Sequence, residues 1–100
     1  MTVNMLRTVK TALRITTDAF DLELVGLIDA AIADLAIAGV NLADAGIEPE
    51  EVPIVARAIC TYCKLNFGEP DNWDILKKAY DEQKAQLAMS QTYNGRGQNG

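Results

Sequence analysis

Histidine is absent from this sequence of 100 residues. Its absence excludes acid-base catalysis by histidine, activation of a serine or cysteine nucleophile by histidine, and most arrangements of zinc ligands. Charged residues are also few, at 23%, whereas hydrophobic residues make up 49% of the chain. A composition of this kind favours a binding or structural role over catalysis, and we expect no cofactor, no metal site and no catalytic residue.

Basic residues are scarce as well. Nine Lys and Arg residues against 14 Asp and Glu residues give a net charge of −5 at pH 7. A protein that binds nucleic acid stably needs a clustered excess of basic residues. Sequence-specific or tight binding of nucleic acid is therefore not expected.

Long apolar runs are lacking. The most apolar stretch, residues 30–40, is interrupted by Asp34 and has about half of the roughly 20 residues that a membrane span needs. No apolar run with a small-residue cleavage site follows the first basic residues, so neither a membrane segment nor a secretory signal is expected. Without such a signal, the two cysteines indicate a reducing compartment and free thiols.

The two cysteines, Cys60 and Cys63, form a CxxC motif. Zinc binding would require two further Cys or His ligands, which the chain does not contain. A redox-active pair normally lies where a helix N-terminus lowers the thiol pKa, whereas this pair falls in the middle of an expected helix. We interpret both residues as ordinary core cysteines, which pack as small hydrophobic side chains.

The periodicity of apolar residues predicts an all-α fold, a small four-helix domain over residues 1–89. A polar stretch with three glycines, residues 90–100, predicts a flexible C-terminal tail. Helices are expected over residues 3–15, from 17 or 18 to 39, from 50–52 to about 67, and from about 71 to 87. The connection over residues 40–51 is expected to contain at most a short helical turn.

The second expected helix is apolar on two sides. Besides its main apolar stripe, Leu22, Val25 and Ile32 project from another side, on which the acidic Asp18, Asp21 and Asp29 also lie. Such a helix is either the central helix of its own domain or the place where another subunit packs, and the pattern leaves both alternatives open.

The first expected helix carries a basic stripe of Arg7, Lys10 and Arg14 on the side opposite its apolar face. The ordinary interpretation of such a stripe is a solvated surface. Carboxylate pairs such as Glu50 and Glu51 lie where helix N-termini attract negative charge, so they need no catalytic role.

Two stretches of the sequence are similar to those of a known family. The first is an amphipathic helix, an acidic turn and a second apolar helix, formed by Val9–Ile15, Thr16–Asp18, Asp21, Leu24 and Leu27–Ala31. The second is an apolar helix that ends in an aromatic residue and a glycine, followed by a last helix and a Ser-x-x-Tyr tail, formed by Val55–Ile59, Tyr62–Lys64, Asn66–Gly68 and Ser90–Tyr93. Over residues 3 to 93 the chain resembles the tailed-phage head-tail connector proteins, also called DNA-packaging adaptors.

The resemblance implies a structural virion protein rather than an enzyme. Subunits of this family form a ring beneath the portal of the phage head, extend the DNA channel, and dock a tail or stopper protein. The implied partners are therefore further copies of the chain, the portal, a tail or stopper protein, and double-stranded DNA that passes through without sequence-specific binding. The implied location is the head-tail junction of the virion, and the host cytoplasm during assembly. No membrane is involved.

A closed ring requires two unlike surfaces on each subunit. We expect Arg7, Lys10 and Arg14 of one subunit to face acidic side chains of the next, around an apolar centre. The acidic and apolar residues expected there are Asp18, Asp21, Asp29, Leu22, Val25 and Ile32.

Tyr93 and Arg96 are the expected docking residues for the portal or tail. The alternative is a small helical regulatory or protein-interaction module of a phage or prophage, which would remain monomeric or dimeric.

Overall fold

A computed structural model describes residues 3–89 of the chain, and these residues form helices and connections without any strand. In chain order the elements are α1 (Val3–Leu13), α2 (Asp21–Ile37), α3 (Leu42–Ala45), a 3-10 turn (Pro49–Glu51), α4 (Pro53–Asn66) and α5 (Trp73–Ala88). The predicted all-α fold and its four long helices are confirmed. The expected tail, residues 90–100, lies outside the described residues.

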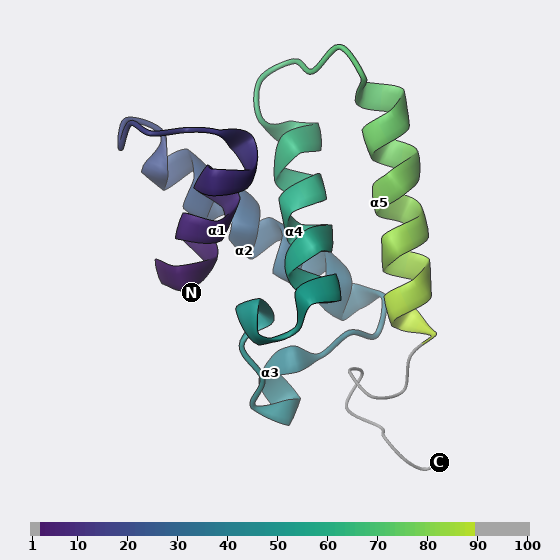
Figure 1. Ribbon diagram of the computed structural model, residues 1–100. Coiled ribbons are helices and arrows are strands. Elements are labelled where there is room, and N and C mark those ends of the chain that lie inside the picture. The colour runs from purple at the N-terminus through teal and green to yellow at the C-terminus, as the bar shows by residue number, and fades with distance from the viewer. Residues whose placement is uncertain (1–2, 90–100) are drawn as a thin grey trace.

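The helices form two layers, with α4 at the centre (Figure 1). In this view α1 and α5 flank α4, and α2 crosses behind α1 and α4. The molecule is correspondingly flat and measures 44 × 28 × 18 Å along its principal axes. One broad side is therefore formed largely by α2.

The core lies where the four long helices meet. α4 buries Val55, Ala58, Ile59 and Cys63 along one face, because residues three and four apart lie on the same side of a helix. Every long helix contributes to the same cluster, and its fully buried members include Met5, Val9, Leu24, Ile28, Ala31, Val55, Ala58, Ile59, Cys63 and Leu87. A cluster of this size is the main source of stability for a small domain.

The first helix ends two residues before the predicted position. The backbone of Arg14 adopts φ +60°, which ends α1 at Leu13. The amide of Arg14 donates to the carbonyl of Thr11 at 3.2 Å, and the amide of Ile15 donates to that of Lys10 at 2.9 Å. This pair of bonds is the Schellman arrangement, which satisfies carbonyls at the end of a helix.

The second helix begins at Asp21, not at residue 17 or 18 as predicted. Thr17 Oγ1 accepts a hydrogen bond from the amide of Ala19 at 3.1 Å, and this bond stabilises a turn before the helix. The ring of Phe20 then packs edge-on against Phe67 at 5.3 Å, which fixes this turn against the end of α4. The predicted connection after residue 39 contains the short α3 and the 3-10 turn.

Candidate functional site

Lys10 forms a charged cluster with the turn that precedes α2. Its Nζ donates to Asp18 Oδ1 at 2.7 Å and lies 2.8 Å from Asp21 Oδ1, the second contact being an ion pair without hydrogen-bond geometry. The hydrogen bond with Asp18, reinforced by Asp21, raises the pKa of Lys10, and the same bond lowers the pKa of Asp18. The structure brings these three side chains together within one chain, and their expected pairing between subunits stays a prediction.

The predicted second apolar stripe of α2 lies partly on the surface and partly against the core. Leu22 is 90% exposed, whereas Val25 is half-buried and Ile32 packs against the core. Ile32 follows the buried Ile28 by four residues and therefore lies on the same side of the helix. The alternatives for this stripe were burial within the domain and exposure to another subunit. Ile32 packs against the core of the domain, whereas Leu22 is exposed.

The outward face of α2 is formed by residues that sequence analysis partly missed. Leu22, Gly26, Asp29, Ala33 and Ile37 are all exposed and follow one another at spacings of four, three, four and four. Leu22 is 90% exposed and Ile37 is 86% exposed. The spacing from Leu22 could have identified this face in the sequence, but Gly26 and Ala33 carry no hydrophobic signal of their own.

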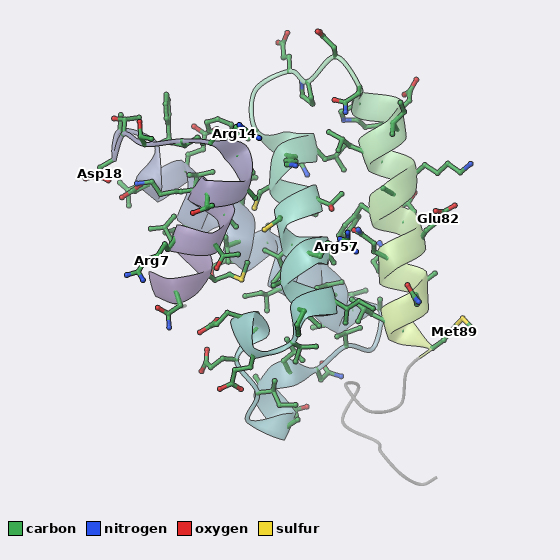
Figure 2. The ribbon with its side chains drawn as sticks, viewed as in Figure 1. Arg7, Arg14, Asp18, Arg57, Glu82 and Met89 are labelled. Atoms are coloured by element: carbon green, nitrogen blue, oxygen red, sulfur yellow. The ribbon has the colours of Figure 1, made fainter. Side chains whose placement is uncertain are left out.

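The helices differ in the sign of their charge. α2 contains four acidic residues and no basic one, namely Asp21, Glu23, Asp29 and Asp34. α1 and α4 contain basic residues and no acidic one. Within the described part of the chain, the exposed Arg7, Arg14, Arg57 and Lys64 form no salt bridge. Figure 2 labels the three arginines. Two basic helices therefore lie against one acidic helix.

A shallow groove runs beside the basic stripe of α1. It has a volume of about 300 Å³ and is lined by Leu6, Arg7, Lys10, Thr11 and Ile15. Leu6 and Ile15 are partly buried against the core and supply an apolar floor, whereas the two cations lie along it. The groove could accommodate an aliphatic side chain with a carboxylate nearby.

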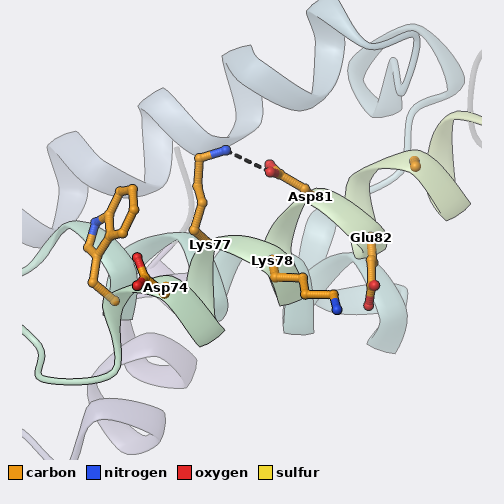
Figure 3. Close-up of a pocket in the computed structure, with 7 residues that line it drawn as sticks. Asp74, Lys77, Lys78, Asp81 and Glu82 are labelled. Carbon is orange, nitrogen blue, oxygen red and sulfur yellow. Dashed lines mark hydrogen bonds and ion pairs between the residues drawn. The ribbon is translucent and has the colours of Figure 1, made fainter.

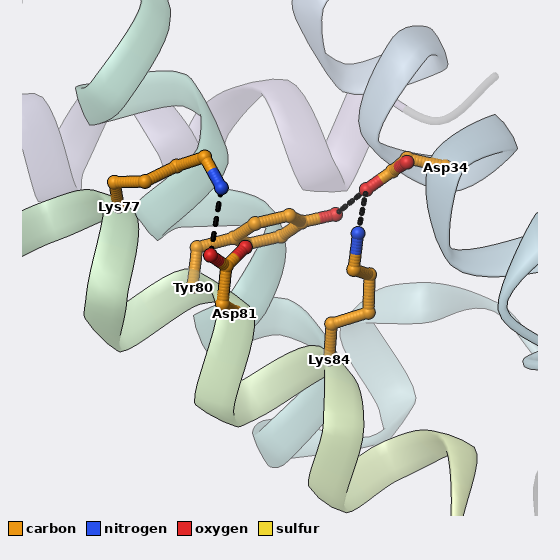
Figure 4. A network of polar contacts seen from close by, with 5 residues as sticks. All are labelled: Asp34, Lys77, Tyr80, Asp81 and Lys84. Atoms are coloured by element: carbon orange, nitrogen blue, oxygen red, sulfur yellow. Dashed lines mark hydrogen bonds and ion pairs between the residues drawn. The ribbon is translucent and has the colours of Figure 1, made fainter.

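A polar network joins α5 to α2 (Figure 4). The hydroxyl of Tyr80 donates to Asp34 Oδ2 at 2.6 Å, and Lys84 Nζ donates to the same oxygen at 3.1 Å. The hydrogen bond from Tyr80, together with that from Lys84, lowers the pKa of Asp34. Burial and the neighbouring carboxylate raise the pKa of Tyr80. The ring of Tyr80 also meets Tyr62 of α4 edge-on at 5.3 Å, so this network holds three helices together.

The outer side of α5 carries an open groove of about 380 Å³ (Figure 3). Lys77 and Asp81 form an ion pair across it at 2.7 Å, whereas Lys78 and Glu82, which have the same spacing, form no salt bridge. Trp73 is 46% exposed at the end of the groove. Alternating charges on one helix surface give no set of convergent groups for a reaction.

Cys63 is buried and Cys60 half-buried, and neither forms a disulfide. Burial raises the pKa of the Cys60 thiol and raises that of Cys63 to about 12. We therefore expect both thiols to react slowly with a disulfide reagent at pH 7 in the folded protein and rapidly after unfolding, because the thiolate is the reacting form. A timed thiol titration with and without denaturant measures this. Fast reaction of either thiol in the folded protein would contradict the assignment of both as core cysteines.

Two features absent from the described residues 3–89 bear on other functions. No helix in this range is long and apolar enough to cross a membrane. The same residues contain no group of three or more His, Cys, Asp or Glu side chains that could hold a metal ion. Tyr93 and Arg96, predicted to dock the portal or tail, lie outside the described range.

Comparison with known proteins identifies the family. A family model described as "phage connector protein" matches residues 5–94, which is nearly the whole chain. No curated protein and no solved structure gave a significant match. The matched range includes α2, α4 and α5 in full and α1 from Met5 onward. The protein is therefore a member of the phage connector family, whose members are structural components of the virion.

Proposed function

We propose that this connector protein is a ring-forming subunit at the head-tail junction. The ring lies beneath the portal, extends the DNA channel and offers a docking surface for a tail or stopper protein. Membership of the phage connector family supports this function. The family alone does not require a ring, and the additional support comes from the surface of α2.

The observation that carries the proposal is the exposed aliphatic surface on α2. The core is already complete without Leu22 and Ile37, which are 90% and 86% exposed. Burying one aliphatic side chain of this size yields about 1.5–3 kcal/mol. Surface charge pairs contribute only about 0–1 kcal/mol each, so Arg7, Arg14 and Asp29 would guide the orientation of neighbouring subunits more than hold them.

The charge of the chain agrees with a channel component. A net charge of −5 gives a ring of such subunits a strongly acidic total, and acidic walls repel the phosphates of DNA. Double-stranded DNA would then pass without being bound. Assembly would take place in the host cytoplasm before the protein becomes part of the virion.

Light scattering on the purified chain and copurification with the portal test this function. We expect the tagged portal ring to retain several copies of the chain, whether or not the free chain is already oligomeric. The alternative, a small helical regulatory or interaction module, predicts a monomer or dimer that the portal does not retain. Absence of the chain from purified virions would also contradict the proposal.

Removal of residues 90–100 tests the docking role of Tyr93 and Arg96. All buried residues identified in the core precede residue 90, so the truncated chain should unfold at the same temperature within about 2 °C. We expect its retention by the portal or the tail protein to be lost, since an aromatic and an arginine are typical anchors of an interface. A variant with Tyr93→Ala and Arg96→Ala in the full chain serves as the matched comparison. Full retention of both variants would contradict the docking assignment.

A further inference from the structure

We propose that the outward face of α2 receives the outward side of α1 from a second copy of the chain, with the closest approach at Gly26. The inference rests on the proposed ring function and names its interface. It retains Leu22 and Asp29 from the sequence-based hypothesis and adds Gly26, Ala33 and Ile37. Two residues that are locally unfavourable, one on each surface, carry the argument.

The first is Gly26, in the interior of the 17-residue helix α2. Glycine inside a helix costs about 0.5–1 kcal/mol relative to alanine. A Cβ atom built at Gly26 meets nothing within 4 Å, and the backbone there is not in the left-handed region. Nothing within the subunit therefore requires a glycine. A glycine does allow the backbone of another molecule to approach closely, and the small Ala33 lies two turns further along the same face.

The second is Arg14, at the end of α1. α2 and α3 end with the same pair of backbone hydrogen bonds as α1, but at the corresponding position they have Gly39 and Gly46. A side chain in this left-handed conformation costs about 1–2 kcal/mol, which glycine avoids. No contact within the described subunit therefore explains why an arginine occupies this position. Arg14 lies just beyond the end of α1, where it lines a groove with Lys64 and Phe67, and it adds an unpaired cation to the end of a helix that also carries the exposed Arg7.

Charge and position together favour α1 as the helix that packs on α2. A second α2 has no basic residue to meet Asp29, and α5 carries equal numbers of acidic and basic residues. α4 also lacks acidic residues, but it is flanked by α1 and α5 (Figure 1). α1 has no acidic residue, and Arg7 and Arg14 remain without a salt bridge inside the described subunit. The groove beside Arg7, with Leu6 and Ile15 on its floor, offers apolar surface to the aliphatic side chains of the neighbouring α2.

The two surfaces are unlike, as a ring requires. Contact between α2 of one subunit and α1 of the next leaves α1 of the first and α2 of the second free for further copies. The contact is therefore heterologous and repeats in one direction until the ring closes. An isologous pair, in which each surface meets its own counterpart, would stop at a dimer.

Substitutions at Gly26 test the close approach without disturbing the fold. Gly26→Ala and Gly26→Gln both place side chains in open space on a helix, so both variants should be folded and at least as stable as the native chain. We expect Gly26→Gln to reduce assembly on the portal by about tenfold or more, and Gly26→Ala to reduce it far less. Ala85→Gln, on the exposed side of α5, is the control for added bulk and should assemble normally. Normal assembly of Gly26→Gln would overturn the proposal.

Cysteine cross-linking identifies which surface of the second copy packs on α2. Thr11→Cys on α1 and Ala33→Cys on α2 are both at exposed positions, and the oxidised native chain controls for Cys60 and Cys63. We expect a cross-linked dimer when the two single variants are mixed on the portal, and a ladder of higher species when one chain carries both changes. Dimers of either single variant alone would show an isologous contact and overturn the proposal. Failure to cross-link in rings that do form would also overturn it, whereas failure of the native chain to assemble would refute the ring function itself.

Discussion

Replacing Ile59 with alanine is expected to lower the free energy of unfolding by about 2–5 kcal/mol, because it opens a cavity that the surrounding helices cannot fill. Ile59 is completely buried in α4, the helix that contacts α1, α2 and α5. A domain of this size has a total stability of about 5–15 kcal/mol. The variant should therefore be close to unfolding at 37 °C, which urea denaturation followed by circular dichroism would measure.

Leu22→Ala is the matched control for this prediction. It removes a side chain of the same size that is 90% exposed, so the free energy of unfolding should change by no more than about 0.5 kcal/mol. Assembly on the portal should nevertheless weaken, because the side chain lies on the outward face of α2. A large loss of stability in Leu22→Ala would show that this face belongs to the core of the subunit.

Asp34→Ala is expected to lower the free energy of unfolding by about 1.5–3 kcal/mol, the range for hydrogen bonds to a charged group. The change leaves the buried hydroxyl of Tyr80 and the ammonium of Lys84 without their shared acceptor. Asp34→Asn keeps an acceptor for Tyr80 and removes the charge, so its effect should be smaller. Equal stability of the native chain and Asp34→Ala would show that core packing alone holds α5 in place.

The same network predicts how stability depends on pH. The pKa of Asp34 is lowered by folding, so its contribution is present above the ordinary value of 3.8 and is lost as the pH falls below it. The pKa of Tyr80 is raised by folding, so its contribution is present below the ordinary value of 10.0 and decreases at higher pH, where the unfolded tyrosine ionises. Unfolding temperatures measured across this range should fall at both ends. Tyr80→Phe should reduce the decrease at high pH, and an unchanged alkaline limb would contradict the assignment.

The likeness to the family and the order of the long helices along the chain could be predicted from the sequence, because both depend on residues that are close together in the sequence. The periodicity of apolar residues predicted the bounds of the four long helices to within a few residues of those observed. The positions of the two cysteines within α4 likewise predicted that both would pack in the core, and Cys63 is buried and Cys60 half-buried. These features require only the geometry of a single helix.

The residues of the candidate interface depend on tertiary contacts that the periodicity of one helix does not determine. Lys10, Asp18 and Asp21 have suitable charges for a contact between subunits, but the turn before α2 brings them together within one chain. Ile32 is as apolar as Leu22, yet one packs on the core and the other is exposed. The sequence did not show that Gly26 faces open space, nor that Arg14 adopts a left-handed conformation.

The sequence by itself determined that this protein is helical and that its second helix has more apolar surface than one face can bury. It also determined that catalysis by histidine is excluded, because the sequence contains no histidine. Only the tertiary structure decided which of those apolar residues remain outside. The side of a helix that is buried depends on where its neighbours pack, and α2 contacts α1 and α4 and buries Leu24, Ile28, Ala31 and Leu35. This packing leaves Leu22, Gly26, Ala33 and Ile37 on the surface, available to another molecule.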